Sequence, residues 1–183
     1  MNRIGPPSLT ISSPSDEATR RCGALLAGLV APGDVVLLCG GLGAGKTTFT
    51  KGLVAALGGE EEVRSPTFTL MRTYATEPVL AHVDCWRLEQ LDEVADLALD
   101  EVLDDGGMAV IEWGEAARPL LGDDALEIEI APLDTAEDDR AGSDDRPRRL
   151  TFTAVSPRWA DRLLELAARG RRDNFIVDYS EAS

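Results

Sequence analysis

Basic residues are scarce in this chain, and their scarcity narrows the range of functions. Its 183 residues hold 18 lysines and arginines against 33 acidic residues, a formal net charge of −15. Only two of the basic residues are lysines, Lys46 and Lys51. A protein that holds nucleic acid by itself normally presents a basic face to the phosphates. Although arginines gather at residues 146–149 and 169–172, the balance favours protein partners over a direct hold on DNA or RNA.

Metal-binding and membrane signals are equally sparse. A single histidine, His82, and three cysteines without C-x-x-C spacing argue against a zinc site. The cysteines, Cys22, Cys39 and Cys85, lie in apolar segments and are predicted to be buried reduced thiols. No apolar run reaches the roughly 18 residues of a membrane span, and the first residues lack the apolar core of a secretion signal. We therefore expect a cytoplasmic protein without membrane contact.

The chain does contain a pattern that binds nucleotide phosphates. The stretch GGLGAGKT, residues 40–47, matches G-x-x-x-x-G-K-T. Glycines let such a loop curl until its backbone N–H groups point at one anion, and Lys46 would reach the outer phosphates. The Thr47 hydroxyl would ligate Mg²⁺, a cation that prefers oxygen. The predicted phosphate-binding loop consists of Gly40, Gly41, Leu42, Gly43, Ala44, Gly45, Lys46 and Thr47.

The surrounding elements alternate as a P-loop domain requires. A buried strand at residues 34–40 precedes the loop, and a helix at residues 46–57 follows it. Further strands are predicted at residues 8–12, 68–74, 79–84, 108–113, 125–130 and 148–155. Further helices are predicted at residues 13–30 (with Ser13 as N-cap), 91–103, 115–120 and 156–169. The predicted fold class is α/β, a P-loop NTPase-like three-layer sandwich with a mostly parallel central sheet and antiparallel additions.

Two segments lack an apolar period. Residues 133–149 are polar and carry both charge signs, so we expect a flexible insert between the last two strands. Residues 171–183 are predicted to form a loosely held tail. Residues 1–170, which include this insert, are predicted to form a single P-loop domain.

Two carboxylates end predicted strands. Asp84 ends one and Glu112 another, where P-loop enzymes hold Mg²⁺ or orient the attacking water. We expect one carboxylate to serve the metal and the other the water, and spacing does not say which. Thr67 lies where switch loops sense the γ-phosphate, although an ordinary turn is equally compatible. Trp86 is expected in the core or in the wall of the site, and Trp113 either fills the core or meets a partner.

Taken together, four motifs resemble the TsaE family, also called YjeE. The motifs are GGLGAGKTTFTKGL, SPTFTL, HVDCWRL and VIEW, in that order, and the resemblance covers about residues 8–130. It implies an ATPase that uses ATP and Mg²⁺, binds the proteins TsaD and TsaB, and is needed for threonylcarbamoylation of adenosine 37 in tRNAs that read ANN codons. The tRNA would be reached only through those partners.

The resemblance also implies residue roles. The loop through Thr48 would hold the phosphates, and Thr47 and Glu112 would serve the Mg²⁺. Asp84 would lie at the γ-phosphate and be needed for hydrolysis, so the implied catalytic set is Lys46, Asp84 and Glu112. Thr67 would belong to a switch-like loop, and Asp16 would lie beside the nucleotide base. The chain departs from the family pattern at Gly41, where an acidic residue is usual, at Trp86, where tyrosine is usual, and in the insert.

Other functions share the P-loop. A small-molecule kinase would need an acceptor pocket and an arginine-bearing lid, which the insert could imitate. A GTPase commonly carries N-K-x-D, but the only asparagines are Asn2 and Asn174, and neither lies in that motif. A nucleotide-dependent scaffold with negligible turnover of its own overlaps with the ATPase interpretation.

Overall fold

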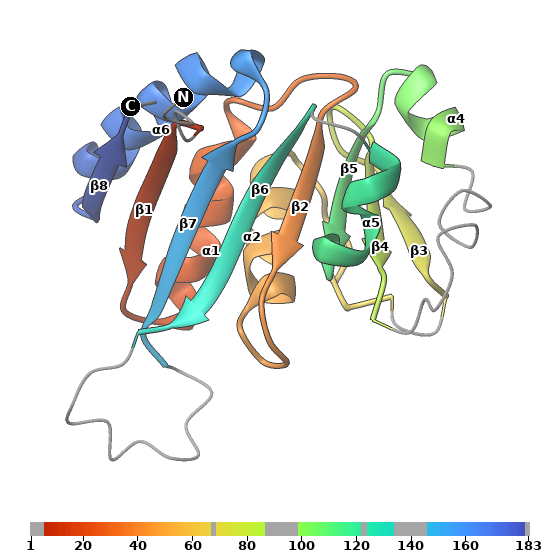
Figure 1. Cartoon of the computed structure of the whole chain (residues 1–183). Helices are drawn as coiled ribbons and strands as arrows, with labels where there is room; N and C mark the ends of the chain where they lie inside the picture. The colour runs from red at the N-terminus through yellow and green to blue at the C-terminus, as the bar shows by residue number, and fades with distance from the viewer. Residues whose placement is uncertain (1–5, 67–68, 87–98, 122–123, 134–145, 182–183) are drawn as a thin grey trace.

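A single mixed β-sheet organises the part of the chain that the structure describes (Figure 1). The computed structural model describes residues 6–66, 69–86, 99–121, 124–133 and 146–181. Within them, eight strands follow the order β3-β4-β5-β2-β6-β7-β1-β8. The strands are β1 (Ser8–Ser13), β2 (Val35–Cys39), β3 (Met71–Tyr74), β4 (Leu80–Asp84), β5 (Met108–Glu112), β6 (Ala125–Pro132), β7 (Arg148–Ala154) and β8 (Ile176–Ser180).

The centre of the sheet is parallel and its flanks are antiparallel. Strands β4, β5, β2 and β6 pair in parallel, whereas β3 pairs antiparallel with β4, and β7, β1 and β8 continue antiparallel beyond β6. Parallel strands need helical crossovers that cover both faces, so their residues are buried throughout. Every residue of β2, β4 and β5 is buried accordingly. The predicted fold class is confirmed.

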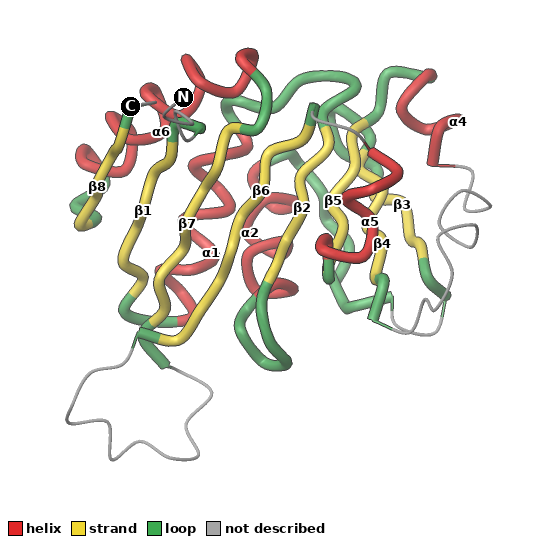
Figure 2. Tube along the Cα trace, in the orientation of Figure 1, coloured by secondary structure: helices red, strands yellow, loops and turns green. Residues whose placement is uncertain are grey.

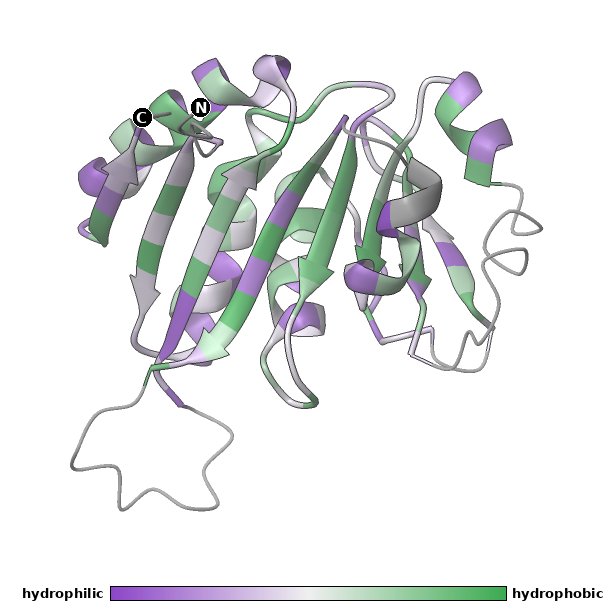
Figure 3. Cartoon of the chain, viewed as in Figure 1, coloured by the Kyte–Doolittle hydropathy of each residue, from purple (hydrophilic) through white to green (hydrophobic). Residues whose placement is uncertain are grey.

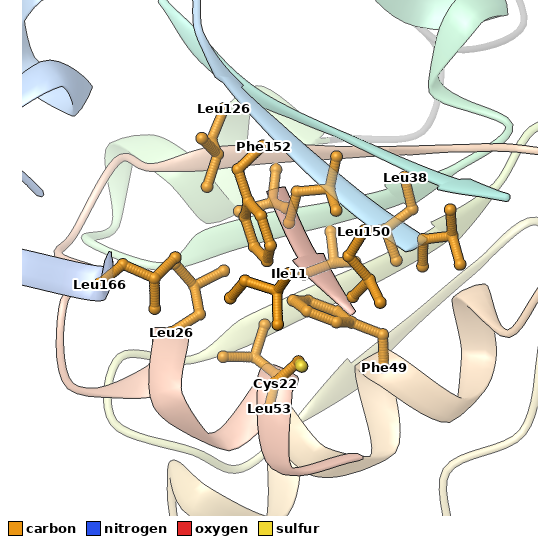
Figure 4. Packing of buried hydrophobic residues seen from close by; sticks show 14 of the residues in the cluster. Ile11, Cys22, Leu26, Leu38, Phe49, Leu53, Leu126, Leu150, Phe152 and Leu166 are labelled. Atoms are coloured by element: carbon orange, nitrogen blue, oxygen red, sulfur yellow. The ribbon is translucent and has the colours of Figure 1, made fainter. Parts of the chain in front are cut away.

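Helices form a layer on each face of the sheet (Figure 2). One core joins the sheet to α1 (Asp16–Ala27), α2 (Lys46–Ala56) and α6 (Pro157–Arg172), and Figure 4 shows its centre around Ile11, Phe49 and Phe152. A second, smaller core joins the other face to α4 (Leu99–Asp104) and α5 (Gly114–Leu121). No helix in the described ranges is both long and apolar enough to cross a membrane.

The antiparallel half of the sheet shows a different hydropathy pattern. In Figure 3, β2 is apolar along its length, whereas β6 alternates between hydrophilic and hydrophobic residues. The burial of β1, β6 and β7 alternates as well, because helices leave most of their second face uncovered in the described ranges, where α5 reaches β6 through the Arg118–Glu127 ion pair. The alternation of apolar and polar residues that predicted a half-buried strand at residues 125–130 therefore reflects the exposure of this second face of the sheet.

The cysteine prediction is confirmed. Cys22, Cys39 and Cys85 are free and buried. Burial raises the pKa of the Cys22 and Cys39 thiols to about 12 and that of Cys85 to about 11. Thiolate is therefore scarce at neutral pH, and these residues act as small apolar side chains.

The structure corrects three boundaries. The N-cap of α1 is Ser15 and not Ser13, because the Ser15 hydroxyl accepts from the Ala18 N–H while Ser13 still pairs in β1. The expected loose tail differs as well: α6 extends to Arg172, and β8 then pairs with β1 as an edge strand. Finally, residues 148 and 149 were included both in the predicted insert and in the predicted strand 148–155; β7 begins at Arg148, so the strand prediction is confirmed and the insert ends earlier. Residues 134–145 lie outside the described ranges.

Helices α1 and α2 approach so closely that only glycine fits at the crossing. A Cβ added at Gly52 would lie 1.8 Å from the Arg20 carbonyl oxygen, and one at Gly23 would lie 2.2 Å from the Phe49 carbonyl oxygen. Both obstacles are helix backbone, which cannot turn aside as a side chain can. The crossing also fixes the N-terminus of α1, and with it Asp16, relative to the P-loop helix α2.

Replacing Gly52 by alanine is expected to lower the free energy of unfolding by about 2 kcal/mol. The overpacking costs about 3 kcal/mol, and the better helix propensity of alanine offsets about 1 kcal/mol of it. Urea unfolding followed by circular dichroism measures the difference. Gly41→Ala is the matched control, because a Cβ there has no atom within 4 Å. Equal unfolding midpoints for the two variants would contradict the close crossing.

Candidate functional site

The candidate site is a pocket at the carboxyl ends of the parallel strands. The P-loop leaves the end of β2, and the neighbouring strands β5 and β4 end in Glu112 and Asp84, which are paired in register. Because these strands are parallel, their carboxyl ends meet at one edge of the sheet, where α/β proteins bind ligands. The pocket measures about 450 Å³ and is lined by Asp16, Leu42, Gly43, Ala44, Gly45, Lys46, Thr47, Thr48, Ser65, Asp84, Trp86, Glu112, Trp113 and Arg148.

The structure thus brings most of the predicted site residues together. Asp16, Asp84, Glu112 and the loop from Leu42 to Thr48 share the one pocket. Gly40 and Gly41 form the start of the loop and supply carbonyl oxygens to Lys46. Thr67 lies outside the described residues, so its predicted role stays a prediction.

The P-loop backbone forms a glycine-rich turn at the start of α2. Gly40, Gly43 and Gly45 have φ angles of 134°, 72° and 109°, in the region that glycine adopts without strain. Gly45 is the N-cap of α2 and has no side chain with which to satisfy the first N–H groups of the helix. Those N–H groups and the helix dipole are available to an anion in the pocket.

Lys46 spans the loop from the first turn of α2. Its Nζ donates to the carbonyl oxygens of Gly40 at 2.7 Å and Gly41 at 2.9 Å, and lies 3.6 Å from the centre of the Trp113 ring. Burial lowers the pKa of Lys46, while the negative charges of Glu112 and other nearby acids raise it. The ammonium group is held in a partly dry site, where its attraction to phosphate is stronger than in water.

The residues present fit a magnesium ion. The Thr47 hydroxyl lies 2.8 Å and 3.1 Å from the two Glu112 carboxylate oxygens, so two oxygen donors meet at one point beside the loop. Mg²⁺ usually takes only one or two protein oxygens and completes its shell with phosphate oxygens and water. The described residues contain no cluster of three or more His, Cys, Asp and Glu side chains that could hold a metal ion by themselves.

Asp84 is held by different partners from Glu112. One of its carboxylate oxygens accepts from the Ser65 hydroxyl, and the other accepts from the Trp86 backbone N–H at 2.9 Å. Ser65 belongs to the loop that leads to β3, so this contact ties that loop to the end of β4. The two strand-end carboxylates, which spacing alone could not distinguish, therefore have distinct surroundings.

Two tryptophans form a wall of the pocket. Their ring centres lie 4.2 Å apart, and Trp86 remains 46% exposed, so it is a wall residue and not a core residue. Trp113 has a φ of 60°, which is rare for a bulky residue and costs about 1 to 3 kcal/mol. The strained backbone turns the indole onto Lys46 and Trp86, and these two contacts help to offset the strain.

Sequence reasoning did not identify Arg148 as a site residue; it placed the residue at the start of a predicted strand and at the end of the predicted insert. Arg148 is buried, lines the pocket and forms an ion pair with Asp16. Its side chain also lies against the P-loop, because a Cβ on Gly45 would come within 2.8 Å of the Arg148 Nε. A signal was present: Arg148 lies two residues before Leu150 and four before Phe152, so the period of two places it on the buried face of β7.

Comparisons of the sequence with known proteins point to one family. The model of the family described as "Threonylcarbamoyl adenosine biosynthesis protein TsaE" matches residues 13–141. The chain belongs to the TsaE family. A TsaE protein of Bacillus subtilis is 41% identical over 159 residues, covering 86% of this chain and 91% of the relative. A TsaE protein of Streptomyces coelicolor is 44% identical over 145 residues, covering 77% and 93%. Both are named as proteins of tRNA threonylcarbamoyladenosine biosynthesis.

A solved structure shares the fold as well as the sequence. The crystal structure of Bacillus subtilis YdiB superposes with a TM-score of 0.67 and is 33% identical. The match covers 91% of this chain and 96% of YdiB. The resemblance to the TsaE family that the four motifs suggested is therefore confirmed.

Proposed function

We propose that this chain is a Mg²⁺-dependent ATPase that enables threonylcarbamoylation of adenosine 37 in tRNAs reading ANN codons. It would act in the cytoplasm as the nucleotide-driven subunit of a complex with TsaD and TsaB. Membership of the TsaE family supports the pathway. One observation carries the proposed ATPase activity: the P-loop threonine and a strand-end carboxylate meet 2.8 Å apart, with a second carboxylate at the end of the adjacent strand.

Each group has a role that follows from its surroundings. Lys46 and the N-terminus of α2 would bind the phosphates, and Thr47 and Glu112 would hold the metal. When bound there, Mg²⁺ would neutralise charge that develops on the transferred phosphoryl group. Asp84, which is not bonded to Thr47 but to Ser65 and the Trp86 N–H, would orient the attacking water.

The pocket offers no base-modifying machinery of its own. Among the described residues that line it, the aromatic side chains are Trp86 and Trp113, and the only cations are Lys46 and Arg148, both buried. Single-stranded RNA is usually read by stacking on exposed aromatic platforms flanked by basic side chains. The chemistry on tRNA is therefore assigned to the partners, and the role of this chain is to couple ATP to their turnover.

Depletion of the protein in its own cells tests the proposal. We expect threonylcarbamoyladenosine in bulk tRNA to fall and to return when the intact chain is re-expressed, as measured by nucleoside analysis of digested tRNA. A second tRNA modification from an unrelated pathway serves as the control and should not change. An unchanged level, in a cell without a second copy of the protein, would overturn the proposed pathway.

Isotope-labelled water separates hydrolysis from phosphoryl transfer to a small molecule. An ATPase places one oxygen of water in the released phosphate, whereas a kinase places the phosphoryl group on an acceptor. We expect the label in phosphate when the chain is incubated with ATP, Mg²⁺ and the TsaD–TsaB complex. Transfer to an added nucleoside or other metabolite would support the kinase alternative, and a preference for GTP would support a GTPase.

A further inference from the structure

His82 is a buried polar residue that the proposed mechanism does not use. It lies in the middle of β4 between apolar neighbours and is fully buried. Its Nε2 lies 2.9 Å from the Oε1 atom of Glu112, which is itself buried at the end of β5. A carboxylate oxygen can only accept a hydrogen bond, so the histidine donates from Nε2. Buried polar groups are costly unless they are bonded, and a histidine at this position calls for a reason beyond packing.

We propose that His82 is a positioning residue that fixes the Glu112 carboxylate for Mg²⁺ binding. The inference rests on the proposed Mg²⁺–nucleotide binding and deepens it. The Oε1 atom of Glu112 receives two hydrogen bonds, one from His82 and one from the Thr47 hydroxyl at 2.8 Å. Thr47 must turn its oxygen toward a metal in order to ligate it. The bond from His82 is then the contact that keeps the carboxylate in place.

The charge near Glu112 explains why such a support matters. Glu112 and Lys46 line the same pocket, where burial lowers the pKa of Lys46 and the negative charge of Glu112 opposes that lowering. A carboxylate without a second support could turn toward the ammonium group and leave the metal position. An N–H at Nε2 of the imidazole fixes the direction of the carboxylate, and the bond to Glu112 requires the ring to carry a proton on that nitrogen. The same arrangement, a partner behind the ligand, tunes affinity at many metal sites.

Three substitutions separate this role from simple packing. The amide nitrogen of glutamine in His82→Gln can occupy the place of the imidazole Nε2 and donate to Glu112. The shorter amide in His82→Asn reaches only the place of Nδ1, and His82→Leu supplies bulk without a donor. The probe is a fluorescent ATP analogue, titrated with Mg²⁺ at fixed nucleotide concentration and, separately, titrated with protein in EDTA. Thermal unfolding of each variant monitors folding.

The expected result is a shift in the Mg²⁺ concentration needed for nucleotide binding. His82→Leu and His82→Asn should need about 10- to 100-fold more Mg²⁺ for half-maximal binding, with the affinity in EDTA unchanged. His82→Gln should stay within a few-fold of the parent. The comparison of the two amides decides the question even where His82→Leu lowers stability, since both amides are polar and differ mainly in reach.

Two outcomes with these variants would overturn the inference. In the first, His82→Leu and His82→Asn need the same Mg²⁺ concentration for half-maximal nucleotide binding as a parent that clearly depends on Mg²⁺. This result would leave the proposed function standing. In the second, all three variants lose nucleotide affinity equally with Mg²⁺ and in EDTA, and their melting temperatures fall. This result would indicate that His82 serves packing. A parent protein whose nucleotide binding ignores Mg²⁺ would refute the metal site itself, and the inference with it.

Discussion

Nucleotide affinity is expected to fall by about 100-fold or more when Lys46 is replaced by alanine. The variant removes an ammonium group from a partly dry pocket, and a hydrogen bond to a charged group contributes up to about 3 kcal/mol, or roughly 100-fold in affinity. Lys46 is also the lysine that lines the pocket and contacts the P-loop carbonyl oxygens. Isothermal titration calorimetry with Mg²⁺–ATP measures the loss directly.

The chain supplies its own control for this experiment. Lys51 is the second of its two lysines and lies on the same helix, α2, but does not line the pocket. Lys51→Ala should bind Mg²⁺–ATP like the parent, and both variants should show the circular dichroism of the folded protein. If Lys46→Ala keeps an affinity within about threefold of the parent, the phosphate-binding role of the loop is wrong.

Hydrolysis is expected to fall by about 100-fold or more in Asp84→Asn while nucleotide binding changes little. Asparagine has nearly the same shape and can still accept from the Trp86 N–H, but it lacks the charge that would polarise water. A positioned group of this kind contributes about 100- to 10,000-fold to a rate. Phosphate release under saturating ATP, with TsaD and TsaB present, measures turnover, and calorimetry measures binding.

The same variant links the chemistry to the cell. Asp84→Asn should fail to restore threonylcarbamoyladenosine in depleted cells, whereas Asp178→Asn, on an exposed position of the edge strand β8, should restore it. A variant that binds weakly but turns over normally once saturated would show that Asp84 acts in binding and not in catalysis. If Asp84→Asn restores threonylcarbamoyladenosine although it has lost hydrolysis, ATP hydrolysis is not needed for the pathway.

The sequence by itself determined the features that depend on neighbouring residues. The P-loop pattern, the apolar runs of β2 and β5 and the alternation in β6 are local, so each predicted its element directly. Strand ends marked by Asp84 and Glu112 were visible for the same reason. Combined with the order of elements, these signals sufficed for the fold class and for most of the residues that line the pocket.

Only the tertiary structure decided how those residues are paired. Which carboxylate faces Thr47 depends on the strand order β4-β5-β2, because the strand beside the P-loop strand delivers Glu112. The burial of Arg148 depends on where β7 enters the sheet, and β8 became a strand because the edge of β1 was available to it. Hydrogen bonds between strands join residues far apart in sequence, and no local period records which partner each strand will find. The contact of His82 with Glu112, across 30 positions of sequence, is of the same kind.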